Sequence, residues 1–213
     1  MDGRLDILFG LVGNGETFAD IGCDHGYVAE RVLKENKFEK VIISDISAKS
    51  LQKAIDLLSP FGNRVTAIVS DGFDKFEVLP DEVMIAGMGG EEIVKILSNA
   101  MSLPKRLVLA PQKNSDKVRR FLVLFGYKIE KDFTFKDRNK FYDAIVAVEG
   151  VDEYSELEYL HGRDNLLNFP DAFKEKLNLE RTMLEDIIAL STASQTSKED
   201  AKVRLENLRK ILK

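Results

Sequence analysis

The sequence has few of the residues that build disulfides and metal centres. It contains one cysteine, Cys23, and two histidines among 213 residues. A single cysteine cannot form an internal disulfide, and two histidines far apart in the sequence cannot by themselves form a usual zinc site. We therefore expect a cytoplasmic protein, in a reducing compartment, without a metal.

Long apolar runs are missing as well. No segment approaches the roughly 18 uninterrupted apolar residues that span a bilayer, and residues 1–10 have no basic region leading into an apolar run. Neither membrane insertion nor secretion is expected. Hydrophobic residues make up 44% and charged residues 31% of the chain, which is typical of a folded globular protein.

The net charge of −5 does not by itself indicate a nucleic-acid partner, but positive charge is concentrated in one segment. Residues 105–140 contain eleven Lys and Arg against four Asp and Glu, a net of +7, whereas residues 1–104 carry a net of −7. A basic face can hold a polyanion while the rest of the molecule repels it. The alternative is a solvated helix and hairpin that are basic by chance.

Short apolar runs alternate with amphipathic stretches, which predicts repeated βα units and a mostly parallel, Rossmann-like sheet. Strands are expected at residues 17–21, 40–44, 64–70, 82–86 and 106–110, and helices at residues 27–36, 47–59, 91–100 and 115–125. Two further strand-like runs flank a polar group and predict an antiparallel hairpin that closes the sheet, at residues 128–135 and 141–148.

Past Gly150 the pattern becomes helical. Two segments have apolar residues at helical spacing: Phe173, Leu177, Leu184 and Ile187 in the first, and Ala201, Leu205, Leu208 and Leu212 in the second. We expect a nucleotide-binding α/β domain at 1–150 and an antiparallel, coiled-coil-like helical hairpin at 151–213, with Thr196 and Glu199 as a capping box. The hairpin braces a substrate or, alternatively, serves only as a scaffold or dimerisation arm. We expect a monomer.

Residues that directly follow the strands are the candidate ligand contacts, because a doubly wound sheet binds ligands at the carboxyl ends of its strands. The first strand leads into DIGCDHGY, which is not the GxGxxG fingerprint of a dinucleotide site. Its carboxylates, Asp20 and Asp24, would repel a diphosphate. They suit a ligand with ammonium and sulfonium charges, such as S-adenosylmethionine.

Acidic residues also end the next two strands. Asp45 is placed to accept hydrogen bonds from ribose hydroxyls, and Asp71 from an adenine amino group. Either alone could be a turn or helix-cap residue, but three acidic strand ends in succession predict a cofactor pocket. The predicted cofactor-binding residues are Asp20, Gly22, Cys23, Gly26, Asp45, Ile46, Asp71, Gly72, Gly87 and Met88.

The chain resembles the bacterial tRNA adenine-22 N1-methyltransferase family, TrmK, over essentially its whole length. The resemblance rests on DIGCDHGY, SDIS, SDGF, IAGMGG, APQKN, FYDAIVA and LHGRDNLLNFPDAF, in this order. It implies a class I methyltransferase fold, S-adenosylmethionine as cofactor, and tRNA as substrate. Asp24 stands where the first motif of class I methyltransferases usually has a glycine, and this substitution is itself distinctive. Two features depart from the family pattern: Cys23 replaces a serine or threonine, and APQKN a Gln-Pro-Asn motif.

Methylation at N1 of adenine needs alignment more than a base, because the N1 lone pair is free at neutral pH. The product ring is cationic, so a carboxylate beside it would stabilise the transition state more than the ground state. Asp24 is the candidate, and its alternative role is to cap the next helix. His25 either contacts a ligand or fixes the turn. A nucleophilic Cys23 is not expected, since neighbours on one turn point in different directions.

The substrate side is expected to combine base contacts with phosphate contacts by the basic residues. The predicted substrate-binding residues are Arg4, Tyr27, Gly89, Gly90, Gln112, Lys113, Asn114, Arg119, Arg120, Arg138 and Lys140. Two rival hypotheses remain: a methyltransferase that acts on a small molecule or a protein, and a nucleotide-sensing module without activity.

Overall fold

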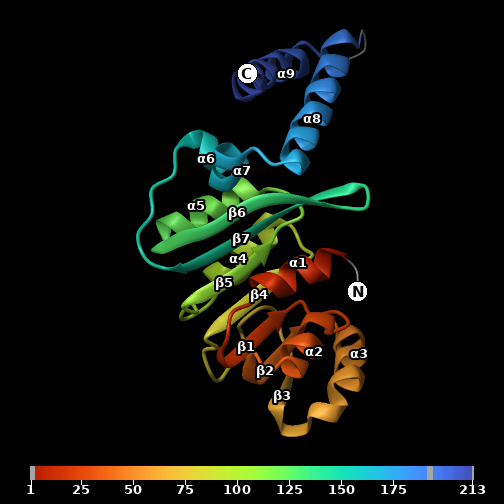
Figure 1. The fold of residues 1–213 in the computed structure, drawn as a ribbon, viewed down its shortest axis with the longest axis vertical. Coiled ribbons are helices and arrows are strands. Elements are labelled where there is room, and N and C mark those ends of the chain that lie inside the picture. Colours follow the sequence, from red (N-terminus) through yellow and green to blue (C-terminus); the bar gives the residue numbers. More distant parts are fainter. Residues whose placement is uncertain (1–2, 191–193, 213) are drawn as a thin grey trace.

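A seven-stranded sheet forms the framework of the computed structural model, which describes residues 3–190 and 194–212 (Figure 1). Its strand order is β3-β2-β1-β4-β5-β7-β6, with β1 to β5 parallel and β7 antiparallel to both of its neighbours. The predicted α/β fold, a parallel sheet closed by an antiparallel hairpin, is confirmed. The strands are β1 (Gly15–Ile21), β2 (Phe38–Asp45), β3 (Val65–Val69), β4 (Glu82–Ala86), β5 (Arg106–Ala110), β6 (Tyr127–Asp137) and β7 (Lys140–Glu149).

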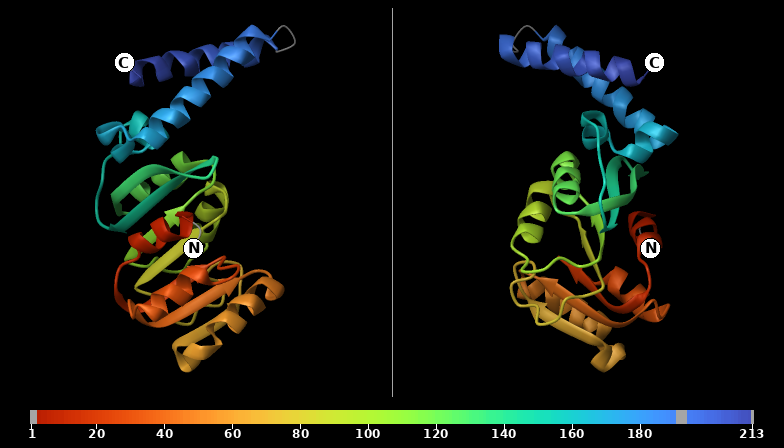
Figure 2. Two further views of the ribbon diagram at one scale, coloured as in Figure 1. Left: turned by 45° about the vertical axis from the view of Figure 1, so that its right-hand side comes forward. Right: turned by 90° about the vertical axis from the view of Figure 1, so that its left-hand side faces the viewer.

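Helices cover both faces of the sheet (Figure 2). Alternate residues of β7 show the two layers, since Ala144 and Val146 pack on one side and Ile145 and Ala147 on the other. On the first side lie α1 (Gly3–Leu11), α2 (Tyr27–Lys34) and α3 (Ala48–Leu58), which is followed by the 3-10 helix η1 (Ser59–Arg64). On the second side lie α4 (Gly90–Ser98) and α5 (Ser115–Leu124). Helix α1 was not predicted, because its nine residues include two glycines and show no clear apolar stripe.

After β7 come two short helices, α6 (Glu156–His161) and α7 (Arg163–Asn168), and then two longer ones, α8 (Asp171–Ala189) and α9 (Gln195–Ile211). We call α8 and α9 the helical arm; it extends beyond the β6 edge of the sheet (Figure 1). The predicted apolar stripes form its core, around Phe173 and Leu205. No helix within the described residues is long and apolar enough to cross a membrane.

The predicted capping box of α9 is wrong. The helix begins one residue before Thr196, and Ser194 caps it by accepting a hydrogen bond from the Ser197 N–H at 3.1 Å. Glu199 instead accepts from the Gln195 amide at 2.7 Å. A serine two residues earlier therefore takes the role that the sequence pattern assigned to Thr196.

Strand β6 lies at the edge of the sheet, where unpaired backbone N–H groups need other acceptors. The segment before the arm supplies them from its side chains, so this segment is fastened to the sheet. The three bonds run from Ile129 N to Asp152 at 3.0 Å, from Asp132 N to Asp164 at 2.8 Å, and from Thr134 N to Asn165 at 2.8 Å.

Candidate active site

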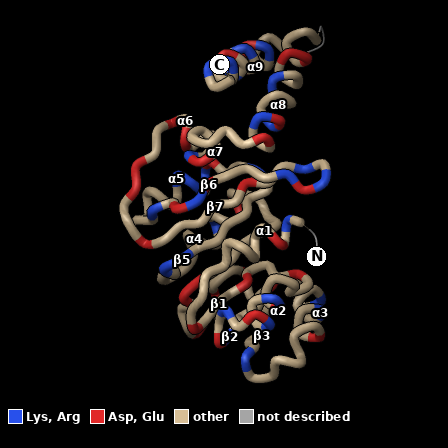
Figure 3. Tube along the Cα trace, viewed as in Figure 1, with Lys and Arg blue, Asp and Glu red and all other residues tan. Residues whose placement is uncertain are grey.

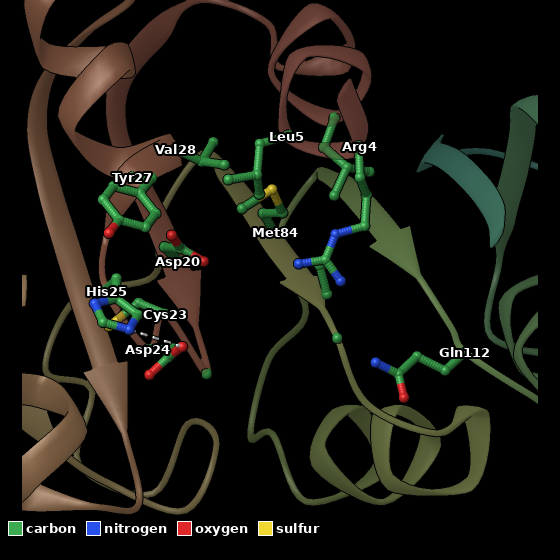
Figure 4. Close-up of a pocket in the computed structure, with 14 residues that line it drawn as sticks. Arg4, Leu5, Asp20, Cys23, Asp24, His25, Tyr27, Val28, Met84 and Gln112 are labelled. Carbon is green, nitrogen blue, oxygen red and sulfur yellow. Dashed lines mark ion pairs between the residues drawn. The ribbon is translucent and has the colours of Figure 1, made fainter. Parts of the chain in front are cut away.

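A pocket of about 610 Å³ opens at the carboxyl ends of β1 and β4, the point where the strand order reverses (Figure 4). Helix α1 contributes Leu5 and Leu8 to its wall, which the sequence reasoning missed together with the helix. Met84 and Val28 add further apolar surface. Nine predicted site residues line the pocket: Arg4, Asp20, Gly22, Cys23, Asp24, His25, Tyr27, Gly87 and Gln112.

The turn between β1 and α2 is built by three residues with positive φ: Gly22 at 73°, Asp24 at 46° and Gly26 at 70°. Its backbone is held by bonds from Gly22 N to Ser44 O at 2.8 Å and from Gly26 N to Cys23 O at 2.8 Å. A Cβ at Gly26 would lie 2.9 Å from the Cβ of Ala54. Gly26 is thus buried against α3 and positions the turn, and it does not line the pocket.

Asp20 is the buried carboxylate of the site, with 4% of its surface exposed. Burial, reinforced by nearby Asp45, raises its pKa to about 7. The same burial, with Asp20 beside it, raises the pKa of the Cys23 thiol. Cys23 therefore stays protonated, which agrees with the expectation that it is no nucleophile. A ligand cation beside Asp20 would lower the pKa of this carboxyl and favour its ionised form.

Asp24 belongs to an exposed cluster that sequence reasoning saw only in part. Its side chain does not cap α2, whose N-cap is Gly26 without a side-chain hydrogen bond. Instead it lies 3.6 Å from His25 Nε2 and 3.7 Å from the ammonium of Lys53 on α3. His25 stacks on Tyr27 with centroids 5.3 Å apart and rings inclined by 6°. Lys53 was missed because only the packing of α3 brings it to this turn.

The second and third acidic strand ends lie at the same sheet edge but outside the lining of the pocket. Asp45 accepts hydrogen bonds from Ser47 N at 2.8 Å and from Asp24 N at 3.3 Å. It therefore orients the first turn. Ile46 is 72% exposed next to it. Asp71 is exposed and lies 3.4 Å from Lys95. Gly72, with φ of 64°, fits closely against Ile96.

Arg4 approaches the pocket from the side opposite Asp20, with Met84 between them, and all three side chains line the pocket (Figure 4). Its guanidinium lies over the Tyr142 ring, 5.4 Å from the centroid. Its Nε is buried without a hydrogen-bond partner among the described residues. A buried donor without an acceptor is costly, so this group is suited to an anionic or carbonyl oxygen of a ligand.

The loops after β4 and β5 fit together along their backbones. Gln112 N donates to Met88 O at 2.9 Å, and Gly90 N donates to Lys113 O at 2.8 Å. A Cβ at Gly90 would lie 2.2 Å from the carbonyl oxygen of Asn114. Gly90 is therefore buried as a packing residue and does not face a substrate. Met88 reaches toward Gly22, and Gly89 has the Lys113 side chain beside it.

The prediction that Arg119 contacts phosphates is wrong, because its side chain is fully buried. It donates from Nε to Asp132 at 2.8 Å and from Nη1 to the Tyr159 carbonyl at 3.1 Å. Arg120 is exposed, but Glu156 holds it through two hydrogen bonds. Charge counted along the sequence overlooked acidic partners that folding brings to α5.

Arg138 and Lys140 lie at the tip of the β6–β7 hairpin, where Lys and Arg positions gather (Figure 3). Because β6 runs in the same direction as β5, this tip lies at the sheet edge that holds the pocket. The tip is separate from the pocket lining. Lys113 is exposed on the loop beside the pocket.

Comparisons with known proteins give the following similarities. Residues 1–145 match a family model described as a methyltransferase domain. The chain is 36% identical to a candidate tRNA methyltransferase of Mycoplasma pneumoniae over 162 residues, covering 73% of this chain and 75% of the relative. It is 28% identical to the tRNA (adenine(22)-N(1))-methyltransferase of Bacillus subtilis over 154 residues, covering 69% and 64%.

Among solved structures, the fold resembles that of M. capricolum TrmK in complex with S-adenosyl-homocysteine. The TM-score is 0.91 at 24% sequence identity, and the alignment covers 100% of this chain and 97% of the other.

Proposed function

The chain belongs to the methyltransferase domain family, and on this premise we propose that it methylates N1 of an adenine in tRNA with S-adenosylmethionine as cofactor. The adenine is that of position 22, as in the name of the Bacillus subtilis relative. One observation supports the chemistry most: the pocket at the strand reversal has the buried carboxylate of Asp20 on one wall and the guanidinium of Arg4 on the other.

The residues present fit this cofactor. Its amino-acid moiety carries one ammonium and one carboxylate, which match Asp20 and the orphaned donor of Arg4. Arg4 is thus proposed to bind the carboxylate of the cofactor inside the pocket, and not a tRNA phosphate outside it. Asp45 at the end of β2 would accept from the ribose hydroxyls, with Ile46 against the adenine. When bound, S-adenosylmethionine supplies an electrophilic methyl group on a sulfonium.

The substrate adenine is proposed to enter beside the first turn, next to Asp24, His25 and Tyr27. The stacked pair of His25 and Tyr27 offers a flat surface to a base that has been turned out of its own stack. Asp24 accepts from the exocyclic amino group and favours the positive charge that develops on the ring. Lys53 also lies beside this carboxylate, so the ring charge that develops during methyl transfer competes with the Lys53 ammonium for Asp24.

The rim of the site is proposed to hold the tRNA backbone. Lys113, Arg138 and Lys140 lie at the pocket edge of the sheet and are the candidates for phosphate contacts. The helical arm beyond β6 braces the RNA further from the pocket. We further propose that residues 1–150 act as the catalytic domain and residues 151–213, which include the helical arm, as a second domain, in a cytoplasmic monomer.

The test uses the purified chain, S-adenosylmethionine with a labelled methyl group, and an unmodified tRNA transcript. Digestion to nucleosides is expected to yield 1-methyladenosine, and a transcript with guanine in place of adenine 22 is expected to stay unlabelled. Label in a different nucleoside, or equal label in both transcripts, would overturn the assignment of base or position. Absence of label in tRNA would favour a small-molecule or protein substrate.

A further inference from the structure

The joint between the helical arm and the sheet is mainly polar. The apolar core of the arm consists of residues from α7, α8, α9 and their connections, and none of these residues belongs to residues 1–150. A cavity of about 380 Å³ beside the joint is lined by His161 of α6 and by residues of α8 and α9, so apolar packing there is incomplete. Besides the packing of the arm core against Leu166 of α7 and of Phe173 against His161 of α6, the position of the arm depends on a few directional contacts with the sheet.

One of these contacts joins α8 directly to the sheet. The ammonium of Lys176 donates to Asp143 Oδ1 of β7 at 2.9 Å. Asp143 also accepts from the Thr134 hydroxyl at 2.7 Å, and its other oxygen lies 3.5 Å from Arg119 Nη2. Although burial opposes ionisation of Asp143, Lys176 and Arg119 outweigh it and lower its pKa to about 2.

Strand β7 also contacts the pocket wall, through Tyr142, the residue before Asp143. Side chains alternate between the two faces of a strand, so Tyr142 and Asp143 point to opposite sides of β7. Tyr142 packs with the α1 layer beneath Arg4, which lines the pocket. Asp143 faces the other way and holds Lys176. The attachment point of the arm is thus fixed, through β7, relative to the methyl-transfer pocket.

We propose that the Lys176–Asp143 ion pair sets the position of the helical arm relative to the pocket, which makes Lys176 a positioning and specificity-determining residue for the RNA. This inference rests on the proposed function, in which the arm braces the tRNA. A second pair, between Lys136 of β6 and Glu175 of α8 at 2.5 Å, is more exposed and is expected to matter less.

The experiment compares Lys176→Met with wild type in the full chain. Lys174→Met is the matched control, because Lys174 lies half a turn away on α8, where its ammonium lies 3.6 Å from Asp171 of the same helix and 5.7 Å from the centre of the Phe169 ring, and neither residue belongs to the sheet. Lys176→Arg is the rescue variant, since a guanidinium can keep the pair with Asp143. For each protein, kcat and KM for tRNA and the Kd for S-adenosylmethionine are measured.

For Lys176→Met we expect KM for tRNA to rise about tenfold, with kcat and the cofactor Kd within twofold of wild type. Lys176→Arg is expected to restore KM, and Lys174→Met to raise it by less than threefold. Equal KM values for the two methionine variants would overturn the inference. So would a parallel loss of cofactor affinity, which indicates general disruption. Absence of tRNA methylation by the wild type would instead refute the proposed function.

Discussion

The buried carboxylate of Asp20 makes cofactor binding dependent on pH in a calculable way. With a pKa of about 7 in the free protein, Asp20 is about 3% ionised at pH 5.5 and about 75% ionised at pH 7.5. If only the ionised form pairs with the ammonium of the cofactor, the Kd for S-adenosylmethionine falls about 25-fold over this range. Calorimetric titrations at several pH values measure this dependence directly.

The variant Asp20→Asn separates this effect from other titrating groups. It keeps the shape of the side chain and removes the charge, so we expect its Kd to be flat between pH 5.5 and 7.5. At pH 7.5 its affinity should be about 10- to 100-fold weaker than that of wild type, the range for losing a charged hydrogen bond. Asp200→Asn in α9, an exposed position far from the pocket, is the control and should keep the wild-type slope.

The same substitution has the opposite effect on stability. A carboxyl whose pKa rises from 3.8 to about 7 on folding costs nothing below pH 3.8, and its cost grows until it is complete above pH 7. The shift corresponds to roughly 4 kcal/mol at most, because each pKa unit is worth about 1.4 kcal/mol. Asp20→Asn should therefore stabilise the cofactor-free protein at pH 8 more than at pH 5. A flat wild-type Kd, or an equally steep Asp20→Asn profile, would refute this reasoning.

Four further changes test other parts of the molecule. Gly90→Ala forces a Cβ within 2.2 Å of the Asn114 carbonyl and should destabilise the fold by about 2 kcal/mol or more, measured by urea unfolding. Arg119→Met leaves a buried carboxylate unpaired and should cost about 3–5 kcal/mol of unfolding free energy. Lys113→Ala with Lys140→Ala should lower the slope of log K for tRNA against log salt by about 2, and an unchanged slope would contradict these phosphate contacts. Asp24→Ala should slow single-turnover methylation at least tenfold, and a rate within threefold of wild type would remove its proposed role.

The sequence predicts the central strands well because β4 and β5 are buried on both faces and are largely apolar runs, whereas the edge strand β3 has no fully buried residue. For β4 and β5 the expected and observed bounds are identical, at 82–86 and 106–110. The resemblance to TrmK is confirmed by the relatives, and the methyltransferase family by the model that matches residues 1–145. Helix α1 was missed because its Leu5 and Leu8 bury against the sheet without forming a regular stripe.

Charge was harder to predict than fold, since an ion pair depends on distances that sequence separation does not reveal. Arg119 meets Asp132 and Asp143, and Arg120 meets Glu156, which is 36 residues away. The positive charge of residues 105–140 is therefore partly neutralised on α5. Arg119 and Arg120 do not contribute their full charge to a basic surface. Lys53 shows the converse, because a residue with no local signal becomes a neighbour of Asp24.

The direction of β6 explains how an acidic pocket and a basic rim can serve one reaction. Because β7 runs antiparallel between β5 and β6, the hairpin tip returns to the edge where β1 and β4 end. Asp20 in the pocket and Lys140 at the hairpin tip thus lie at the same edge of the sheet, although Lys140 does not line the pocket. A site that attracted phosphate would repel a sulfonium cofactor, so one local charge cannot hold both ligands. In the proposed function, separating the two charges along a single sheet edge lets the cation bind inside the pocket and the polyanion outside it.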